Sequence, residues 1–108
     1  MTMKTFLKKS ITFKDGSVWT DGTQVYVCVE HDQPRIAYLS QVEFPEGVKK
    51  VHSVNLYKYF EEFEQYSMTD IEEAVMDGRC LSLTGQDVEP DGWDSEGFPS
   101  LLLAAGMC

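Results

Sequence analysis

The chain has 108 residues and a formal net charge of -9 at pH 7, from 18 acidic and nine basic side chains. Hydrophobic residues make up 43% of it and aromatic residues 12%, which is too rich for a disordered chain. This length predicts a single domain over residues 1–108. The acidic charge argues against direct binding to nucleic-acid phosphates or to an anionic membrane. No apolar run approaches the roughly 20 residues that span a bilayer.

The three cysteines, Cys28, Cys80 and Cys108, are odd in number and widely spaced. A disulfide framework in a small secreted chain uses an even number. Even with His31 and His52 as further ligands, no pair has the short spacing of a zinc knuckle. We therefore expect reduced thiols, no metal and no other cofactor. The first ten residues lack an apolar stretch of signal-peptide length, and we expect a cytoplasmic protein.

Short β-rich segments separated by turn residues fill the first half of the chain. The Asp-Gly pairs at 15–16 and 21–22 predict tight hairpin turns, because both central positions of the favoured turn need positive φ. Val25, Val27 and Val29 alternate with other side chains, which is typical of a strand with one apolar face. The predicted strands span residues 5–14, 17–20, 23–30, 35–44 and 80–84, and residues 51–56 could complete another.

In the second half the hydrophobic period becomes helical. Four apolar side chains at the spacing i, i+3, i+4 and i+7 predict an amphipathic helix over residues 55–66. These side chains are Leu56, Tyr59, Phe60 and Phe63. A second helix is predicted over residues 70–77, because Thr69 and Glu72 form a capping-box pattern and Gly78 suits a left-handed end.

Strands that come first and helices that follow predict an α+β fold. We expect an antiparallel β-meander of four to five strands with two helices packed on one face. The apolar segment at residues 98–108 is too short for a membrane span. It is expected to fold back as a helical turn or an edge strand and to complete the core. The alternative is self-association through exposed leucines.

The negative charge is concentrated in one part of the chain. Residues 1–60 hold six acidic and eight basic side chains, a net of +2. Residues 61–96 hold twelve acidic side chains and Arg79 alone, a net of -11. The net negative charge of the protein therefore comes from residues 61–96.

Helix electrostatics explains only part of this charge. Asp70 and its acidic neighbours in a predicted first turn are each stabilised by about 0.3–1 kcal/mol. The three glutamates at positions 61–64 instead approach a predicted helix C-terminus, where a carboxylate is unfavourable. Glu73 and Asp77 repel each other at i, i+4, at a cost of about 0.2–0.5 kcal/mol. Carboxylates at unfavourable positions indicate a partner that needs them.

Acidic side chains three or four positions apart on a helix lie about 5–6 Å apart. Duplex DNA also presents rows of closely spaced negative charge. We expect the acidic face to dock on a basic surface of another protein, such as one that normally holds nucleic acid. The alternative is a solvated acidic face that keeps a small protein soluble. The predicted partner-binding residues are Glu61, Glu62, Glu64, Glu73, Asp77, Asp87, Asp91, Trp93, Asp94 and Glu96.

The acidic loop at residues 87–98 partly matches a calcium-binding loop. Acids occupy its first, third and fifth positions and glycine its sixth. Phe98 stands where a bidentate glutamate is needed, and Pro90 interrupts the pattern, so an EF-hand site is not predicted. A looser cation site stays open. We expect Trp93 and Phe98 to hold the loop on the domain while its acids face water, although Trp93 could instead anchor a partner.

The sequence does not predict an enzyme. It has no Gly-x-Ser-x-Gly motif and no Gly-rich phosphate loop. His31 lies in a predicted turn and His52 precedes a predicted helix, so neither is placed with a nucleophile and an orienting acid. The runner-up to the docking hypothesis is a small assembly protein that oligomerises through its sheet edge and its apolar C-terminal segment.

The C-terminal sequence resembles the tails of small uncharacterised acidic bacteriophage proteins. The resemblance rests on the run Asp-Gly-Trp-Asp-Ser-Glu-Gly-Phe-Pro-Ser at residues 91–100, which leads into leucines and alanines. It covers under a fifth of the chain. It implies a compact viral protein that binds a host factor in the host cytoplasm as a stoichiometric inhibitor, and it assigns no role to any residue.

Overall fold

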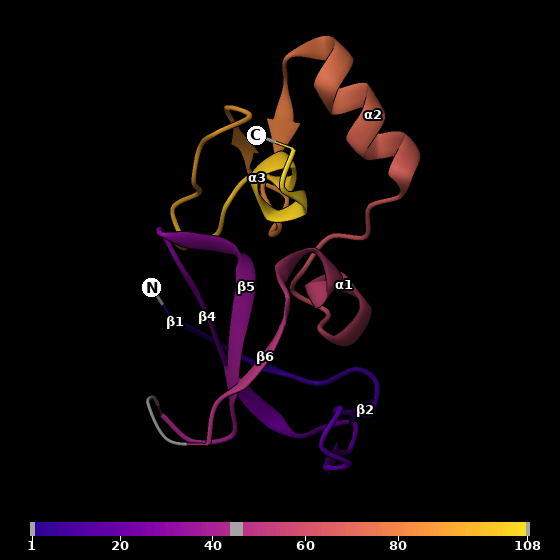
Figure 1. Ribbon diagram of the computed structural model, residues 1–108, viewed down its shortest axis with the longest axis vertical. Coiled ribbons are helices and arrows are strands. Elements are labelled where there is room, and N and C mark those ends of the chain that lie inside the picture. The colour runs from indigo at the N-terminus through magenta and orange to yellow at the C-terminus, as the bar shows by residue number, and fades with distance from the viewer. Residues whose placement is uncertain (1, 44–46, 108) are drawn as a thin grey trace.

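The computed structural model describes residues 2–43 and 47–107 (Figure 1). A four-stranded antiparallel sheet in the order β1-β4-β5-β6 forms the body of the molecule. Its strands are Thr2–Phe6 (β1), Gln24–Glu30 (β4), Gln33–Ser40 (β5) and Lys49–His52 (β6). Two antiparallel pairs lie outside it: Ile11–Thr12 (β2) with Val18–Trp19 (β3), and Cys80–Leu81 (β7) with Asp87–Val88 (β8). The fold is α+β with an antiparallel meander, as the sequence predicts.

The described helical segments are short. They are a 3-10 turn at Ser53–Asn55 (η1) and the α-helices Leu56–Tyr59 (α1), Met68–Asp77 (α2) and Leu101–Ala105 (α3). The turn η1 and helix α3 contact β5 of the sheet, and α2 contacts α3. Figure 1 shows α2 beyond one end of the sheet and the β2–β3 hairpin at the other end of the long axis, which measures 39 Å.

Alternation along β4 separates the two faces of the sheet. Val25, Val27 and Val29 are at most 1% exposed, whereas Tyr26 and Cys28 between them are half-buried. The valines face the core that the helical segments cover. The largest fully buried side chains of this core include Phe60, Phe98, Leu39, Leu56 and Leu101.

The first predicted helix is wrong in length. It was expected over residues 55–66, but α1 ends at Tyr59, because Phe60 is extended at φ -128° and ψ 140° and forms a β-bridge with Leu7. Phe63 is still 3% exposed and contacts the rings of Phe60 and Phe98. The i, i+3, i+4, i+7 pattern therefore correctly predicted which side chains are buried, but it predicted the wrong backbone conformation after Tyr59.

The predicted strand over residues 5–14 is also wrong. The chain leaves the sheet after Phe6 and then forms the separate β2–β3 hairpin. Of the predicted strand 80–84, only Cys80–Leu81 is a strand. The fourth strand, predicted over residues 35–44, is wrong at its end, because β5 ends at Ser40 and residues 41–43 are not strand. Position 44 lies outside the described residues. The second helix begins at Met68, two residues earlier than predicted.

The C-terminal apolar segment folds back as a helical turn and completes the core. Leu101 and Leu102 are 2% and 3% exposed, and Ala104 is fully buried. Ser100 caps α3 by accepting a hydrogen bond from Leu103 N at 3.1 Å. The alternative of an exposed leucine surface for self-association is therefore wrong for Leu101 and Leu102. None of the helices in the described chain has both the length and the apolar character needed to cross a bilayer.

Candidate functional site: an acidic cleft beside helix α2

Helix α2 is fixed at both ends by local chemistry. Ser67 accepts a hydrogen bond from Asp70 N at 3.3 Å, and Asp70 Oδ2 accepts one from Ser67 N at 2.8 Å. This capping box stands two residues before the predicted Thr69–Glu72 pair, so the predicted cap is wrong. Gly78 ends the helix in the left-handed conformation at φ 66°.

Only a small part of α2 is packed against the rest of the protein. Ile71 is its one buried side chain, and Ala74 is half-buried. Met68, Val75 and Met76 are 66%, 52% and 87% exposed. Helix propensity and end caps are weak on their own, so most of the stability of a helix this short has to come from the Ile71 side.

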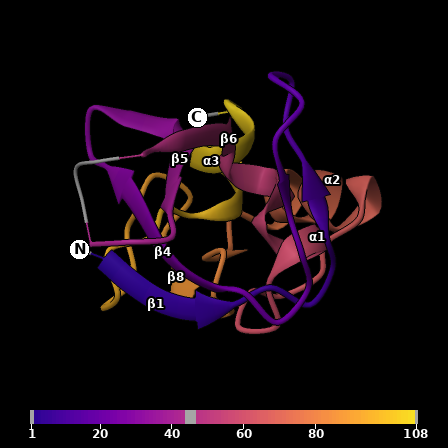
Figure 2. The same cartoon turned by 90° about the horizontal axis from the view of Figure 1, so that it is seen from below.

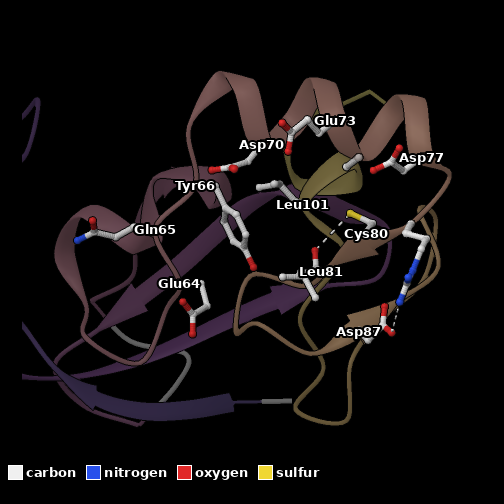
Figure 3. A pocket seen from close by; sticks show the side chains of 12 residues that line it. Glu64, Gln65, Tyr66, Asp70, Glu73, Asp77, Cys80, Leu81, Asp87 and Leu101 are labelled. Carbon is white, nitrogen blue, oxygen red and sulfur yellow. Dashed lines mark hydrogen bonds and ion pairs between the residues drawn. The ribbon is translucent and has the colours of Figure 1, made fainter.

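An acidic cleft of about 590 Å³ lies between α2 and the β7–β8 pair (Figure 3). Asp70, Glu73 and Asp77 follow one another along the side of α2 that borders this cleft. Asp87 faces them from β8, and Glu64 comes from the segment before the helix. Four of the ten predicted site residues therefore meet in one place: Glu64, Glu73, Asp77 and Asp87.

The cleft has a half-buried aromatic wall. Tyr66 donates a hydrogen bond from its hydroxyl to the Ser82 carbonyl oxygen at 2.7 Å. Burial raises the pKa of this hydroxyl above its usual range, and the charge of Glu64 raises it further. Tyr66 thus stays neutral and ties the cleft to the residue that follows β7, so the charged groups of the cleft are its carboxylates and Arg79.

A second hollow of about 560 Å³ adjoins the first, because both are lined by Arg79 and Asp87. It adds Asp91 and Trp93 from the predicted set. Arg79 Nη2 lies 3.6 Å from Asp87 Oδ2, with both side chains mostly exposed. Such an exposed pair is worth little, so Arg79 only partly offsets the negative charge here.

Trp93 is half-buried and stacks on His31, with ring centroids 4.0 Å apart and an angle of 30° between the planes. This contact joins the acidic loop to the turn between β4 and β5. Phe98 is fully buried. Both aromatic side chains hold the loop on the domain, as expected, and part of the Trp93 ring lies against its own chain.

Asp94 departs from the expectation that the loop acids face water. It is 9% exposed and accepts hydrogen bonds from Glu96 N and Phe98 N, each at 2.9 Å. The Thr84 hydroxyl also donates to this carboxylate. Asp94 is therefore an organising residue of the loop and does not belong to the exposed acidic surface.

The other predicted site residues lie apart from the two hollows. Glu61 and Glu96 are exposed but line neither of them. Glu62 accepts a hydrogen bond from the Thr5 hydroxyl of β1. The predicted set missed two carboxylates, Asp70 in the cleft and Glu89 in the second hollow. The signal for Asp70 lay in its helical spacing, three residues before Glu73 and seven before Asp77, since these spacings share a helix face.

The lysines of the first half do not neutralise the cleft. Among the described residues the two ion pairs are Lys49 with Asp15 and Arg79 with Asp87. Neither joins a base of residues 1–60 to an acid of residues 61–96. Lys49, with Ser17, also lowers the pKa of Asp15 well below its usual range.

Cys28 and Cys80 are free thiols. Cys108 lies outside the described residues. Within residues 2–43 and 47–107, no three His, Cys, Asp or Glu side chains are grouped so as to hold a metal ion. No family model, curated protein or solved structure matches the chain. The site is therefore interpreted from its own geometry.

Proposed function

We propose that this protein is a non-enzymatic binding protein that docks its acidic cleft on a basic surface of another protein. The observation that carries the proposal is the meeting of five carboxylates, from α2, β8 and the segment before α2, around one cleft with Arg79 as their one basic neighbour among the described lining residues. A basic partner would gain from each unpaired carboxylate, and the shared field would speed association.

The energetics of α2 supports the same interpretation. Asp77 lies in its last turn, where the helix dipole disfavours a carboxylate, and no basic residue occupies that turn. Glu73 and Asp77 also repel each other at i, i+4. A helix with one buried side chain tolerates this cost poorly, which favours a role for the charges outside the chain's own stability.

Helix α2 also exposes apolar side chains, although none of them lines the acidic cleft. Met68, Val75 and Met76 are more than half exposed on α2. Flexible methionines adapt to a partner surface and bury well. Met68 and Val75 lie on the opposite side of the helix from Asp70 and Asp77, so they would add apolar contact only with a partner that extends around α2 beyond the cleft.

A basic surface that normally binds nucleic acid is the partner class we favour. Carboxylates spaced about 5–6 Å apart along a helix can replace phosphates in such a site. The protein would then act as a stoichiometric inhibitor, which is also what the resemblance of its C-terminal sequence to bacteriophage proteins implies.

The test is an affinity capture from bacterial lysate at low and high salt, with the wild-type chain and the variant Glu73→Lys/Asp77→Lys. The wild type is expected to retain a basic protein at low salt, to release it at high salt, and to release it when duplex DNA is added. The charge-reversal variant is expected to lose the captured protein.

The matched control is Asp21→Lys/Glu43→Lys, which makes the same change in net charge at two exposed positions outside the cleft. This control should retain the partner. Equal loss in both variants would show that net charge alone attracts the captured protein and would contradict a role for the cleft. Capture that is insensitive to salt would contradict the electrostatic proposal as a whole.

A further inference from the structure

A third hollow, the basic groove, lies on a different part of the molecule. It has a volume of about 870 Å³ and runs between strand β6 and the β2–β3 hairpin. Figure 2 shows this hairpin, in indigo, standing alongside β6. The charged and titratable side chains that line the groove are Lys14, Asp15, Arg35, Lys49, Lys50 and His52. Its polarity is therefore opposite to that of the acidic cleft.

Strand β6 is an edge of the sheet. It pairs with β5 through the register Ile36↔His52 to Leu39↔Lys49, and it has no second strand partner within the described chain. Apart from this β5–β6 ladder, no backbone hydrogen bond that joins elements of the described chain involves residues 49–52. An edge strand of this kind presents unpaired N–H and C=O groups to an extended chain.

Some of the cations in the groove already have partners and others do not. Lys49 pairs with Asp15 and lies 5.4 Å from the centroid of the Phe13 ring. Arg35 donates to the Gly106 carbonyl oxygen at 3.3 Å. Lys14 and Lys50 are exposed and have no acidic partner in the described structure, although Lys50 Nζ lies 5.7 Å from the centroid of the Tyr38 ring. These two side chains are the ones that an incoming anion would meet.

We propose that the basic groove binds an extended acidic segment of a partner protein, which adds to β6 as a further strand and places carboxylates against Lys14 and Lys50. The main chain of the segment would supply the hydrogen bonds, and its acidic side chains would meet Lys50 on the strand and Lys14 on the hairpin. The half-buried Phe13 and Tyr59 give the groove aromatic contact area for the other side chains.

A peptide suits this groove better than the two other polyanions that could enter it. Nucleic acid cannot satisfy alternating donors and acceptors of a strand edge, and a long polyanion is repelled by a chain of net charge -9. A second copy of this chain carries many of its acids on helix α2 and in turns, neither of which can add as a strand. Figure 1 places α2 and the hairpin at opposite ends of the long axis, which measures 39 Å. Charges are screened within about 8 Å at physiological salt, so α2 repels a short acidic peptide in the groove only weakly.

The experiment measures fluorescence anisotropy of a labelled, alternating Glu-Thr octapeptide titrated with the protein. The wild type is expected to bind it, and backbone amides of Lys49–His52 are expected to gain protection from hydrogen exchange. A peptide methylated on alternate backbone nitrogens should bind about tenfold more weakly, because it loses several hydrogen bonds. An alternating Lys-Thr peptide should not protect the amides of Lys49–His52, because its cations favour the acidic cleft and not the basic groove.

Charge reversal locates the site. Lys14→Glu/Lys50→Glu should weaken binding by about tenfold or more, whereas the matched control Lys4→Glu/Lys9→Glu, at exposed positions outside the groove, should stay within about twofold. Thermal unfolding of both variants verifies that each is folded, and a variant that fails to fold is replaced by Lys50→Gln alone. The proposal is overturned if the Glu-Thr peptide does not bind, or if N-methylation leaves its binding unchanged. It is also overturned if the groove binds only a single-stranded oligonucleotide, or only a second copy of the chain as measured by sedimentation.

Discussion

The central sheet and helix α2 differ in what holds them in place. In the sheet, Val25, Val27, Ala37 and Leu39 are fully buried, and they belong to the continuous core that Phe60, Phe98 and the C-terminal leucines complete. Helix α2 is stabilised mainly by its capping box and by the burial of Ile71, while like charges repel one another along the cleft. The sheet is organised for stability and α2 for exposure, which is the pattern expected of a scaffold that presents a binding surface.

Phe60→Ala gives the largest expected loss of stability, about 3–5 kcal/mol in the free energy of unfolding, because it removes a fully buried ring and leaves a cavity. Chemical denaturation measures it. The control on α2 is Val75→Ala, which changes a half-exposed side chain and should cost under about 0.5 kcal/mol. Similar losses for the two variants would contradict the contrast between scaffold and helix.

Asp94→Ala tests whether this acid organises the loop or serves the acidic surface. Removal of its carboxylate leaves the buried Phe98 N–H without an acceptor, so a loss of about 1–3 kcal/mol is expected. Asp91→Ala is the control, since Asp91 is exposed, and it should leave the stability unchanged within about 0.5 kcal/mol. If Asp94→Ala lowers the free energy of unfolding no more than Asp91→Ala does, Asp94 does not organise the loop and is again a candidate for contact with a partner.

Ser67→Ala removes the N-cap of α2 and should cost about 1 kcal/mol. The loss is expected to be local: amide exchange should quicken over Met68–Asp77 and stay unchanged in β4 and β5. Thr69→Ala is a matched control, because Thr69 lies inside the helix and Ser67 caps it. A larger effect at Thr69 would show that the cap sits where the sequence alone suggested.

Glu73→Gln should stabilise the protein slightly, by about 0.2–0.5 kcal/mol, because it relieves the repulsion from Asp77. The same change should weaken binding to a basic partner, so stability and binding would move in opposite directions. Added salt should reduce the gain in stability. A loss of stability in Glu73→Gln would show that this carboxylate is needed by the fold itself.

Asp15 lies in the turn of the β2–β3 hairpin, and carboxyl NMR should give this side chain a pKa below its usual range. The reason is that hydrogen bonds from Lys49 and Ser17 favour the charged form. A pKa that is lower in the folded state means stability that is present above the unfolded-state pKa and lost as pH falls through the folded-state pKa. Lys49→Met should raise the pKa of Asp15. An unchanged pKa would exclude Lys49 as the main cause.

Sequence patterns predicted the elements that local chemistry controls. The period-2 valines of β4 and the location of the hairpin turn at Asp15–Gly16 follow from strand alternation and from backbone freedom at glycine, although Gly16 alone of the pair has a positive φ, 89°. The hairpin predicted at Asp21–Gly22 is wrong, because β3 pairs with β2 and β4 with β1. The α+β class and the clustering of negative charge followed from composition along the chain. For the site, helical spacing was sufficient to place Glu73 and Asp77 on one face.

Patterns failed where a distant residue changed the outcome. Phe60 leaves the helical conformation to bridge with Leu7, a contact between segments more than fifty positions apart. The backbone of residues 94–98 turns around the Asp94 carboxylate, and nothing in the charge of that residue distinguishes it from exposed Asp91. Asp87 reaches the cleft only because the β7–β8 pair brings it opposite α2.

By itself, then, the sequence determined which segments prefer strand or helix, which side chains are apolar enough to be buried, and that residues 61–96 carry the negative charge. Those properties depend on each residue and its near neighbours. Only the tertiary structure decided that Glu64, Asp70, Glu73, Asp77 and Asp87 border one cleft, that Asp94 is buried, and that Lys14 and Lys50 flank a free strand edge. These outcomes depend on packing between distant segments, because burial and long-range pairing set the final position of a side chain after local preferences are satisfied.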